Sequence, residues 1–313
     1  NTNIKNAQNL YIAEDATISA NATESGKGGR IIVFAEETSR IYGAISVTSA
    51  EEGKGGFVET SGKEYLQVTQ APIVGAGGEW LIDPYDIEIV AGSGNTDINA
   101  ATPFESTGDT AQLGVDLITS ALGAGTNVTV TTGAGGSQVG NITFEDSILA
   151  NVGGTGATLT FTAHNDINVT GYNIIGVSQP LDLVFDADSN NSGSGELKLG
   201  GSLLQTIGGF LSFGANGDPD ALVVTDSLVI NSGDGEVNFW GTVNSEAGEN
   251  NILDITAGAG DINFKQAVGA SQSLGQLKIS SAAKANFDST VQSLSILCTV
   301  IPSVLKFNST VVT

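Results

Sequence analysis

The stretch that decides the fold is Asp-Ile-Asn-Phe at residues 261–264, because close copies of it recur along the chain. Asp-Ile-Asn stands at residues 97–99 and Asp-Ile-Asn-Val at residues 166–169. Apolar residues that alternate with polar ones predict β-strands, and the Gly, Asn, Asp and Ser residues between them predict turns. Short strands that recur every few tens of residues predict a solenoid. Further alternating segments occur at residues 141–144, 158–161, 236–239 and 276–279.

Two Gly-Lys-Gly-Gly turns, at residues 26–29 and 53–56, are each followed by a similar strand. Their spacing along the chain predicts an internal repeat of one coil. Neither turn is a P-loop, since no Gly-Lys-Ser/Thr leads into a helix. With roughly 22 residues per coil and a strand spacing of about 4.8 Å, we expect about 14 coils in a rod about 65–70 Å long.

We therefore predict an all-β protein, a right-handed parallel β-helix with one short amphipathic helix. The helix is expected over residues 109–122, with Asp109 as its cap, Gln112 in a capping box and Gly123 at its end. We expect three parts: an N-terminal β-helix segment at 1–95, a junction with the helix at 96–126 and a repetitive segment at 127–313. The apolar face predicted for the helix consists of Leu113, Leu117, Ile118, Ala121 and Leu122.

Aromatic residues recur in the later repeats, and stacking along the inside is typical of solenoids. The residues that we expect to stack are Phe210, Phe213, Phe239, Phe264 and Phe287. The segment at 80–87, Trp-Leu-Ile-Asp-Pro-Tyr-Asp-Ile, interrupts the pattern. Pro84 cannot donate a ladder hydrogen bond, so a strand ends there, and the two aromatic residues predict a packed corner.

The chain is acidic, with 34 acidic and 11 basic residues and a net charge of −23. Both arginines lie in the first 40 residues, so we expect no basic surface in the rest of the chain. We therefore expect no binding to nucleic acid. No apolar run approaches the roughly 20 residues that a membrane-spanning helix needs, so no membrane insertion is expected. The chain contains no methionine, which predicts a processed piece of a longer product.

Catalytic and metal-binding residue types are sparse. The single histidine, His164, and the single cysteine, Cys298, exclude a His- or Cys-rich metal site. Cys298 is expected to be a buried small apolar residue, with an intermolecular disulfide as the alternative. The best calcium candidate is the alternating set of oxygen ligands Asp186, Asp188 and Asn190. Beyond calcium, no cofactor is expected.

Two carboxylate pairs keep an enzyme among the alternatives, because glycosidic hydrolysis needs only two carboxyl groups at a suitable separation. The pairs are Asp186 with Asp188 and Asp218 with Asp220, and both lie in turn-like sequence. A binding module would need an exposed aromatic platform, for which Trp80, Tyr85 and Trp240 are candidates. Glycosylation sequons occur at Asn21, Asn127, Asn141, Asn168, Asn190 and Asn308.

The segments at residues 53–63, Gly-Lys-Gly-Gly-Phe-Val-Glu-Thr-Ser-Gly-Lys, and at 80–87 resemble secreted exoproteins of the filamentous haemagglutinin class. The resemblance covers roughly residues 20–290, and these two motifs are more specific than the repeats. It implies a right-handed β-helix, two-partner secretion through an outer-membrane transporter, and a secreted or bacterial cell-surface location. The amino-terminal secretion domain of that class is not complete here, so the transporter is expected to bind the parent protein.

The expected function is that of a non-catalytic structural and adhesive β-helix at the cell surface. Its partners would be glycans or proteins of a host or neighbouring cell, and other copies of itself. Strand-like sequence at residues 3–12 and 300–312 predicts end-to-end or strand-addition assembly. The alternatives are a carbohydrate- or host-protein-binding module and a β-helical polysaccharide-degrading enzyme.

Overall fold

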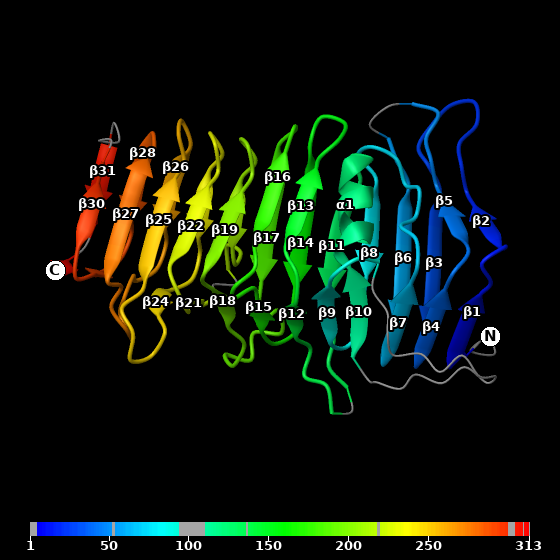
Figure 1. Cartoon of the computed structure of the whole chain (residues 1–313), viewed down its shortest axis with the longest axis horizontal. Helices are drawn as coiled ribbons and strands as arrows, with labels where there is room; N and C mark the ends of the chain where they lie inside the picture. The colour runs from blue at the N-terminus through cyan, green and yellow to red at the C-terminus, as the bar shows by residue number, and fades with distance from the viewer. Residues whose placement is uncertain are drawn as a thin grey trace.

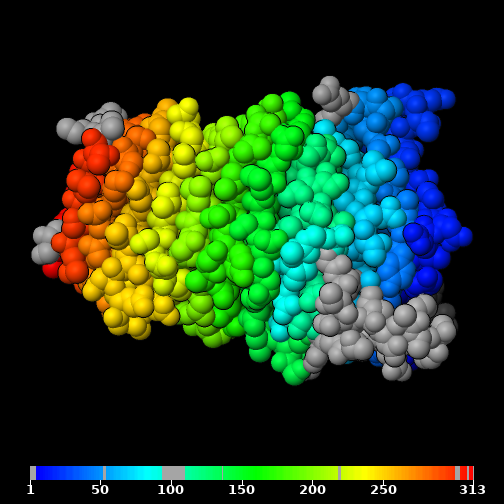
Figure 2. Space-filling model, in the orientation of Figure 1, coloured from blue at the N-terminus to red at the C-terminus, as the bar shows by residue number. Residues whose placement is uncertain are grey.

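The computed structural model describes residues 5–51, 54–93, 110–135, 137–217, 220–299, 304–308 and 310–312. Strands make up 47% of the chain and helix 3%. Parallel coils stack into a β-solenoid of about 10 turns, so the predicted parallel β-helix with a single helix is confirmed. Figure 2 shows consecutive parts of the chain as successive bands along the long axis. No helix in the described part of the chain is both long and apolar enough to cross a membrane.

The strands line three faces of the solenoid, which we call the first, second and third sheets (Figure 1). Only the first is one continuous hydrogen-bonded sheet, since strand pairing divides the second face into three sheets and the third into two. The first sheet has eleven strands, in the order β3 (Arg30–Ala35), β6 (Phe57–Gly62), β8 (Glu79–Ile82), β11 (Asn127–Thr131), β14 (Ala157–Thr162), β17 (Leu181–Asp186), β20 (Leu211–Phe213), β23 (Val237–Phe239), β26 (Asp261–Phe264), β28 (Lys284–Phe287) and β31 (Val304–Phe307). Each coil contributes one strand to this sheet, so the sheet records the order of the coils.

The second sheet follows the first along each coil. It holds β1 (Asn9–Ile12), β4 (Thr38–Ile41), β7 (Tyr65–Val68), β10 (Ala111–Gly114), β9 (Ile87–Val90), β12 (Ile142–Phe144), β15 (Ile167–Asn168), β18 (Leu197–Leu199), β21 (Leu222–Val224), β24 (Val243–Ser245), β29 (Val291–Gln292) and β32 (Val311–Val312).

The third sheet closes most of the coils. It holds β2 (Thr17–Ser19), β5 (Ala44–Ser46), β13 (Ile148–Asn151), β16 (Ile174–Val177), β19 (Ser202–Gln205), β22 (Leu228–Asn231), β25 (Ile252–Thr256), β27 (Gln276–Ser281) and β30 (Ile296–Cys298).

The coils are longer than the sequence predicted. Arg30 pairs with Phe57, so the two Gly-Lys-Gly-Gly turns do mark one coil. Glu79, however, pairs with Asn127, much further along the chain, because this coil contains the helix and an extra strand. The prediction of 14 coils is therefore wrong. About 10 turns at a spacing of about 4.8 Å give a rod of about 48 Å rather than 65–70 Å.

A ladder of stacked phenylalanines fills the core of the C-terminal half. Neighbouring rings lie 4.5–5.8 Å apart and within 18° of parallel. The ladder, which we call the phenylalanine ladder, consists of Phe161, Phe185, Phe213, Phe239, Phe264, Phe287 and Phe307. The prediction for Phe210 is wrong, because this side chain is 38% exposed. Side chains alternate across a strand, so Leu211 and Phe213 point inward and Phe210 does not.

The same inward column is not aromatic in the N-terminal half. Register places Val33, Thr60, Ile82 and Val130 in line with Phe161. Four different coils thus fill one position with three residue types, whereas seven coils of the C-terminal half fill it with phenylalanine.

One helix, α1 (Val115–Gly123), occupies the place of a strand in the third sheet, beside β13. Its buried residues include Leu117, Ile118, Ala121 and Leu122, as predicted. The predicted start is wrong: residues 111–114 form β10, and the helix begins after Gly114 without a side-chain cap. Gln112 therefore lies in a strand, and Asp109 lies outside the described residues, as does the repeat copy at 97–99. Pairing of β10 with β9 outweighs the local helix signal.

The strand β10 is out of sequence order in the second sheet. It pairs with β9 and lies against β7, so it sits between two strands that precede it in the chain (Figure 1). In the coil that begins with β8, the second sheet has two strands, β10 and β9, whereas the first sheet has only β8. The coil that contains α1 therefore carries one strand more than its neighbours.

The corner at residues 80–87 is packed as predicted. Trp80 is fully buried and donates a hydrogen bond from Nε1 to Thr60 Oγ1 at 3.1 Å. Strand β8 ends before Pro84. The Tyr85 ring packs against the backbone at Gly135, where an added Cβ would lie 2.3 Å from it.

Candidate functional site

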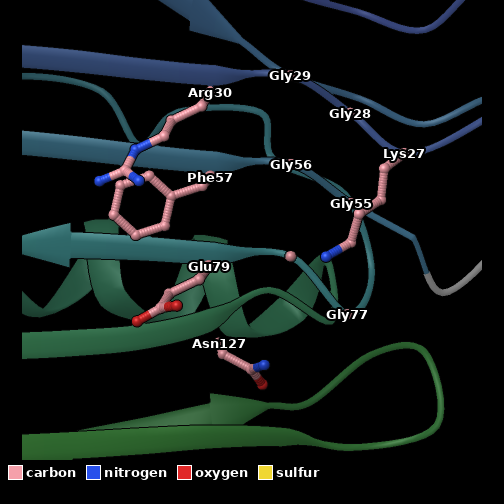
Figure 3. A pocket seen from close by; sticks show the side chains of 11 residues that line it. Lys27, Gly28, Gly29, Arg30, Gly55, Gly56, Phe57, Gly77, Glu79 and Asn127 are labelled. Atoms are coloured by element: carbon pink, nitrogen blue, oxygen red, sulfur yellow. The ribbon is translucent and has the colours of Figure 1, made fainter.

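A groove of about 420 Å³ lies where the strands of the first sheet begin (Figure 3). Three consecutive coils enter β3, β6 and β8 through paired glycines, at residues 28–29, 55–56 and 77–78. These glycines form the floor of the groove. We call it the glycine-floored groove.

The floor requires glycine because the backbones of successive turns touch. A Cβ on Gly28 would lie 1.9 Å from the Val47 carbonyl oxygen, and one on Gly55 would lie 2.7 Å from Gly78 N. No side chain fits at such distances. The repeated Gly-Gly pairs are therefore a steric requirement of stacking, and the hollow above them follows from the missing side chains.

The floor amides are used within the protein. Gly28 N donates to the Lys54 carbonyl, Gly55 N to the Ala76 carbonyl and Gly77 N to the Gly125 carbonyl. The groove is thus not an anion-binding nest of free N–H groups of the kind found in a P-loop. Recognition in the groove would depend on the side chains along its walls.

One wall is a row of outward side chains in register on four neighbouring strands: Arg30, Phe57, Glu79 and Asn127. The Arg30 guanidinium lies 4.5 Å from the centre of the Phe57 ring, which holds it over the aromatic face. Lys27 extends from the glycine turn on the other side of the groove (Figure 3).

The acidic and amide groups of this row are fixed by neighbours. Glu79 Oε1 accepts a hydrogen bond from the Thr129 hydroxyl at 3.2 Å. Asn127 Oδ1 accepts one from Thr158 N at 2.8 Å. Each group keeps further hydrogen-bonding capacity, since a carboxylate has two oxygens and a primary amide has two N–H donors.

The two cations of the groove differ from most others in the chain. Lys27 and Arg30 are exposed, and neither forms an ion pair with any residue that the structure describes. By contrast, Lys54 pairs with Glu51, and Lys63 lies 3.5 Å from Glu36. In a chain of net charge −23, two uncompensated cations on one groove form a local positive site.

Two of the calcium candidates make hydrogen bonds within the described structure. Both Asp188 oxygens accept hydrogen bonds from its own turn, Oδ1 from the Ser192 amide and hydroxyl and Oδ2 from Gly193 N. Asn190 contacts the His164 ring through Nδ2. Slight burial raises the pKa of Asp188, but the Ser192 and Gly193 hydrogen bonds outweigh it and hold that pKa below its usual value.

Asp186 is half-buried at the end of β17, next to that turn. Among the described residues, no three Asp, Glu, His or Cys side chains gather in a way that could hold a metal ion. The calcium site at Asp186, Asp188 and Asn190 stays a prediction.

The second carboxylate pair is only partly described. Asp220 is 4% exposed and accepts a hydrogen bond from Ala187 N at 2.8 Å, which ties one coil to the next. Asp218 lies outside the described residues. Asp220 therefore has a structural contact that the sequence did not reveal.

The six sequon asparagines are spread along the chain. Several use their amide group to join coils: Asn21 Oδ1 accepts from the Ser46 hydroxyl, and Asn141 Oδ1 accepts from Asn165 Nδ2. Glycosylation stays a prediction for all of them. Three are exposed and three half-buried: Asn21, Asn190 and Asn308, and Asn127, Asn141 and Asn168.

The three candidate platform aromatics do not lie together on an exposed surface. Trp80 is fully buried and Tyr85 is half-buried at the corner. Trp240 is half-buried, donates to the Ser212 hydroxyl at 3.1 Å and has the Lys265 ammonium 5.9 Å from its ring centre. Cys298 is half-buried, and its burial raises the pKa of the thiol.

A half-buried carboxyl, that of Asp83, lies in the corner between the first and second sheets. Burial raises the pKa of Asp83 to about 6; the Glu59 carboxylate adds to this rise and Lys63 opposes it. Lys63 itself extends over the Phe34 ring, with Nζ 5.6 Å from the ring centre. This group was not singled out from the sequence, because its burial depends on coils that are distant in the chain.

Sequence reasoning noticed the glycine turns but missed the groove. The signal was present: superposing turn on turn places Arg30 beside Phe57, and the Gly-Gly pair at 77–78 extends the stack by one coil. No protein-family model matches the chain, and no curated protein matches its sequence. The resemblance to the filamentous haemagglutinin class stays a prediction based on its two motifs.

Proposed function

We propose that the protein is a non-catalytic structural and adhesive rod of the bacterial cell surface, similar in role to exoproteins of the filamentous haemagglutinin class. It would be secreted through a two-partner system as part of its parent. The parallel β-solenoid supports this role, because each coil contacts only its neighbours and length is gained by adding coils.

One observation carries the assembly part of the proposal: an apolar end face at β31. Leu305 is 42% exposed, although its partner one coil back, Ala285, is fully buried. Phe307 ends the phenylalanine ladder half-buried, although its partner Phe287 is fully buried. In the described structure no further strand covers these inward-facing side chains.

A strand from a second copy, added in parallel register, would bury this face. It would satisfy the edge of β31 and extend the inward column past Phe307, as each coil does for the one before it. Other exposed apolar residues lie at the same end, in β30 and β32: Leu297, Val311 and Val312. We therefore propose end-to-end joining of rods.

Negative-stain electron microscopy of the native protein tests the proposal, with sedimentation at rising concentration as the second measurement. We expect linear assemblies whose repeat is near the rod length. Leu305→Lys should abolish them, because a charge on an end face blocks strand addition. Val229→Lys is the matched control, since Val229 is 40% exposed on the side of the rod, in β22. Monodisperse single rods at high concentration would contradict assembly.

A further inference from the structure

We propose that the glycine-floored groove binds a sugar residue that bears a single carboxylate, such as a uronic acid in an otherwise neutral glycan. The inference rests on the adhesive role proposed above and names a ligand for it. It follows from three properties of the groove: its size, its uncompensated cations and the order of groups along its wall.

The size suits one or two sugar residues. A volume of about 420 Å³ lies within the usual range of roughly 300–1,000 Å³ for ligand pockets. The floor admits a ligand close to the backbone because the glycines lack side chains, and the backbones of successive turns are already in contact there. The groove therefore exists before a ligand binds, and little ordering cost opposes binding.

The cations select an anionic group. A guanidinium presents a planar fork that matches a carboxylate, and Arg30 is already oriented by the Phe57 ring. Lys27 supplies a second positive charge from the opposite side of the groove (Figure 3). Because neither forms an ion pair with described residues, a ligand carboxylate would not have to displace an internal partner.

The remaining wall selects a polyol and excludes a polyanion. Glu79 lies two strands from Arg30, about 10 Å away at the usual strand spacing, and Asn127 follows it. A carboxylate and an amide next to each other accept from and donate to sugar hydroxyls. A second negative charge on the ligand would face Glu79, and the chain's charge of −23 repels polyanions.

The test uses two small ligands that differ only at one carbon: methyl β-D-glucuronide, with a carboxylate, and methyl β-D-glucoside, with a hydroxymethyl group. Binding to the full chain is followed by amide chemical shifts in NMR titrations. We expect the glucuronide to shift the amides of the groove and to bind at least about tenfold more tightly than the glucoside.

Variants place the binding in the groove. Arg30→Gln and Lys27→Gln should each weaken glucuronide binding about tenfold, because each removes a charged partner. Lys54→Gln is the matched control, since Lys54 stands at the equivalent position of the next turn but pairs with Glu51. This control should bind within about twofold of the parent. Both groove residues are exposed, so unchanged melting temperatures should show that the variants fold.

Three results would overturn the inference. Equal binding of the two glycosides would show that the groove does not recognise the carboxylate, and it would leave the adhesive role unaffected. Undiminished glucuronide binding by the Arg30→Gln, Lys27→Gln double variant would show that the glucuronide does not bind in the groove. If neither glycoside binds, the proposal of a sugar ligand is refuted. The assembly test on Leu305 does not depend on that outcome.

Discussion

The two halves of the rod achieve the same stacking by different means. From β14 onward, seven coils place phenylalanine at one inward position, and asparagines form a parallel row outside, where Asn263 bonds to Asn238 at 2.9 Å and Asn286 bonds to Asn263 at 2.8 Å. Before β14 the same inward position holds Val33, Thr60, Ile82 and Val130.

The difference shows what uniform columns do. Identical side chains in register stack without adjustment. Successive phenylalanines of the ladder are 24, 28, 26, 25, 23 and 20 residues apart in the chain. The N-terminal half varies its columns, and it also contains the glycine-floored groove, the helix α1, the out-of-order strand β10 and the half-buried carboxyl of Asp83. The features that suit ligand recognition thus gather where the stack is irregular.

The largest expected loss of stability comes from replacing a glycine of the groove floor, and a glycine in an open turn serves as the comparison. Gly28→Ala should cost about 3 kcal/mol or more, at the upper end of overpacking, because its Cβ would meet the Val47 carbonyl at 1.9 Å. Gly193→Ala in the C-terminal half should cost about 1–2 kcal/mol, because φ is +78° but nothing lies within 4 Å. Urea unfolding of both variants measures the contrast. Equal losses would mean that the groove floor is not sterically fixed.

The next effect tests the phenylalanine ladder. Phe239→Leu should cost about 1–3 kcal/mol, because it removes two stacked pairs worth about 0.5–1.5 kcal/mol each. Ile82→Leu in the aliphatic part of the column should cost less than about 1.5 kcal/mol, since the volume is conserved. Chemical unfolding gives both values. A Phe239→Leu loss no greater than that of Ile82→Leu would show that stacking adds nothing to burial.

A smaller effect depends on pH and belongs to the irregular half. The pKa of Asp83 is about 6 in the folded chain, above its ordinary value of 3.8, so the folded state binds this proton more tightly. Its contribution to stability is therefore greatest below about pH 4 and is lost as the pH rises through 6. Asp83→Asn should gain stability relative to the parent on going from pH 4 to pH 7, as measured by urea midpoints. A constant difference across that range would refute the assignment.

The smallest effect concerns the ion pairs between regular coils. Lys278 Nζ lies 2.6 Å from Asp254 Oδ2 on the neighbouring strand. Both side chains are partly exposed, so Lys278→Gln should cost only about 0.2–1 kcal/mol. A double-mutant cycle with Asp254→Asn isolates the pair. A coupling well above that range would mean that these pairs, rather than the stacked columns, stabilise the C-terminal half.

The sequence predicted the strands and the solenoid well because alternation and turn residues are local signals. The orientation of Phe210 could also have been predicted from the sequence. Side chains alternate along a strand, so an inward-facing Leu211 implies that Phe210 faces outward. The start of the helix could not be read locally, because residues 111–114 become a strand only through pairing with β9. The number of coils was overestimated because most coils are longer than 22 residues, as shown by the 27 residues from Arg30 to Phe57, the 28 from Leu183 to Leu211 and the 48 from Glu79 to Asn127.

The candidate site was harder to predict than the fold. Each groove residue looks ordinary in the sequence, and the site arises only when Arg30, Phe57, Glu79 and Asn127 are stacked in register. The three coils that separate these four residues differ in length, and the last is by far the longest. Periodicity alone cannot supply such unequal lengths, so it cannot align the four side chains.

The extra strand β10 resembles the edge dislocation of a crystal, in which an additional half-plane is inserted on one side only. It adds about 4.8 Å to the second face. On the third face α1, about 10 Å wide, replaces a strand and adds a similar thickness. Two faces thus lengthen together while the first sheet stays continuous from β8 to β11. A rod of this design can take up an inserted element at a single defect without disturbing the register of the coils on either side.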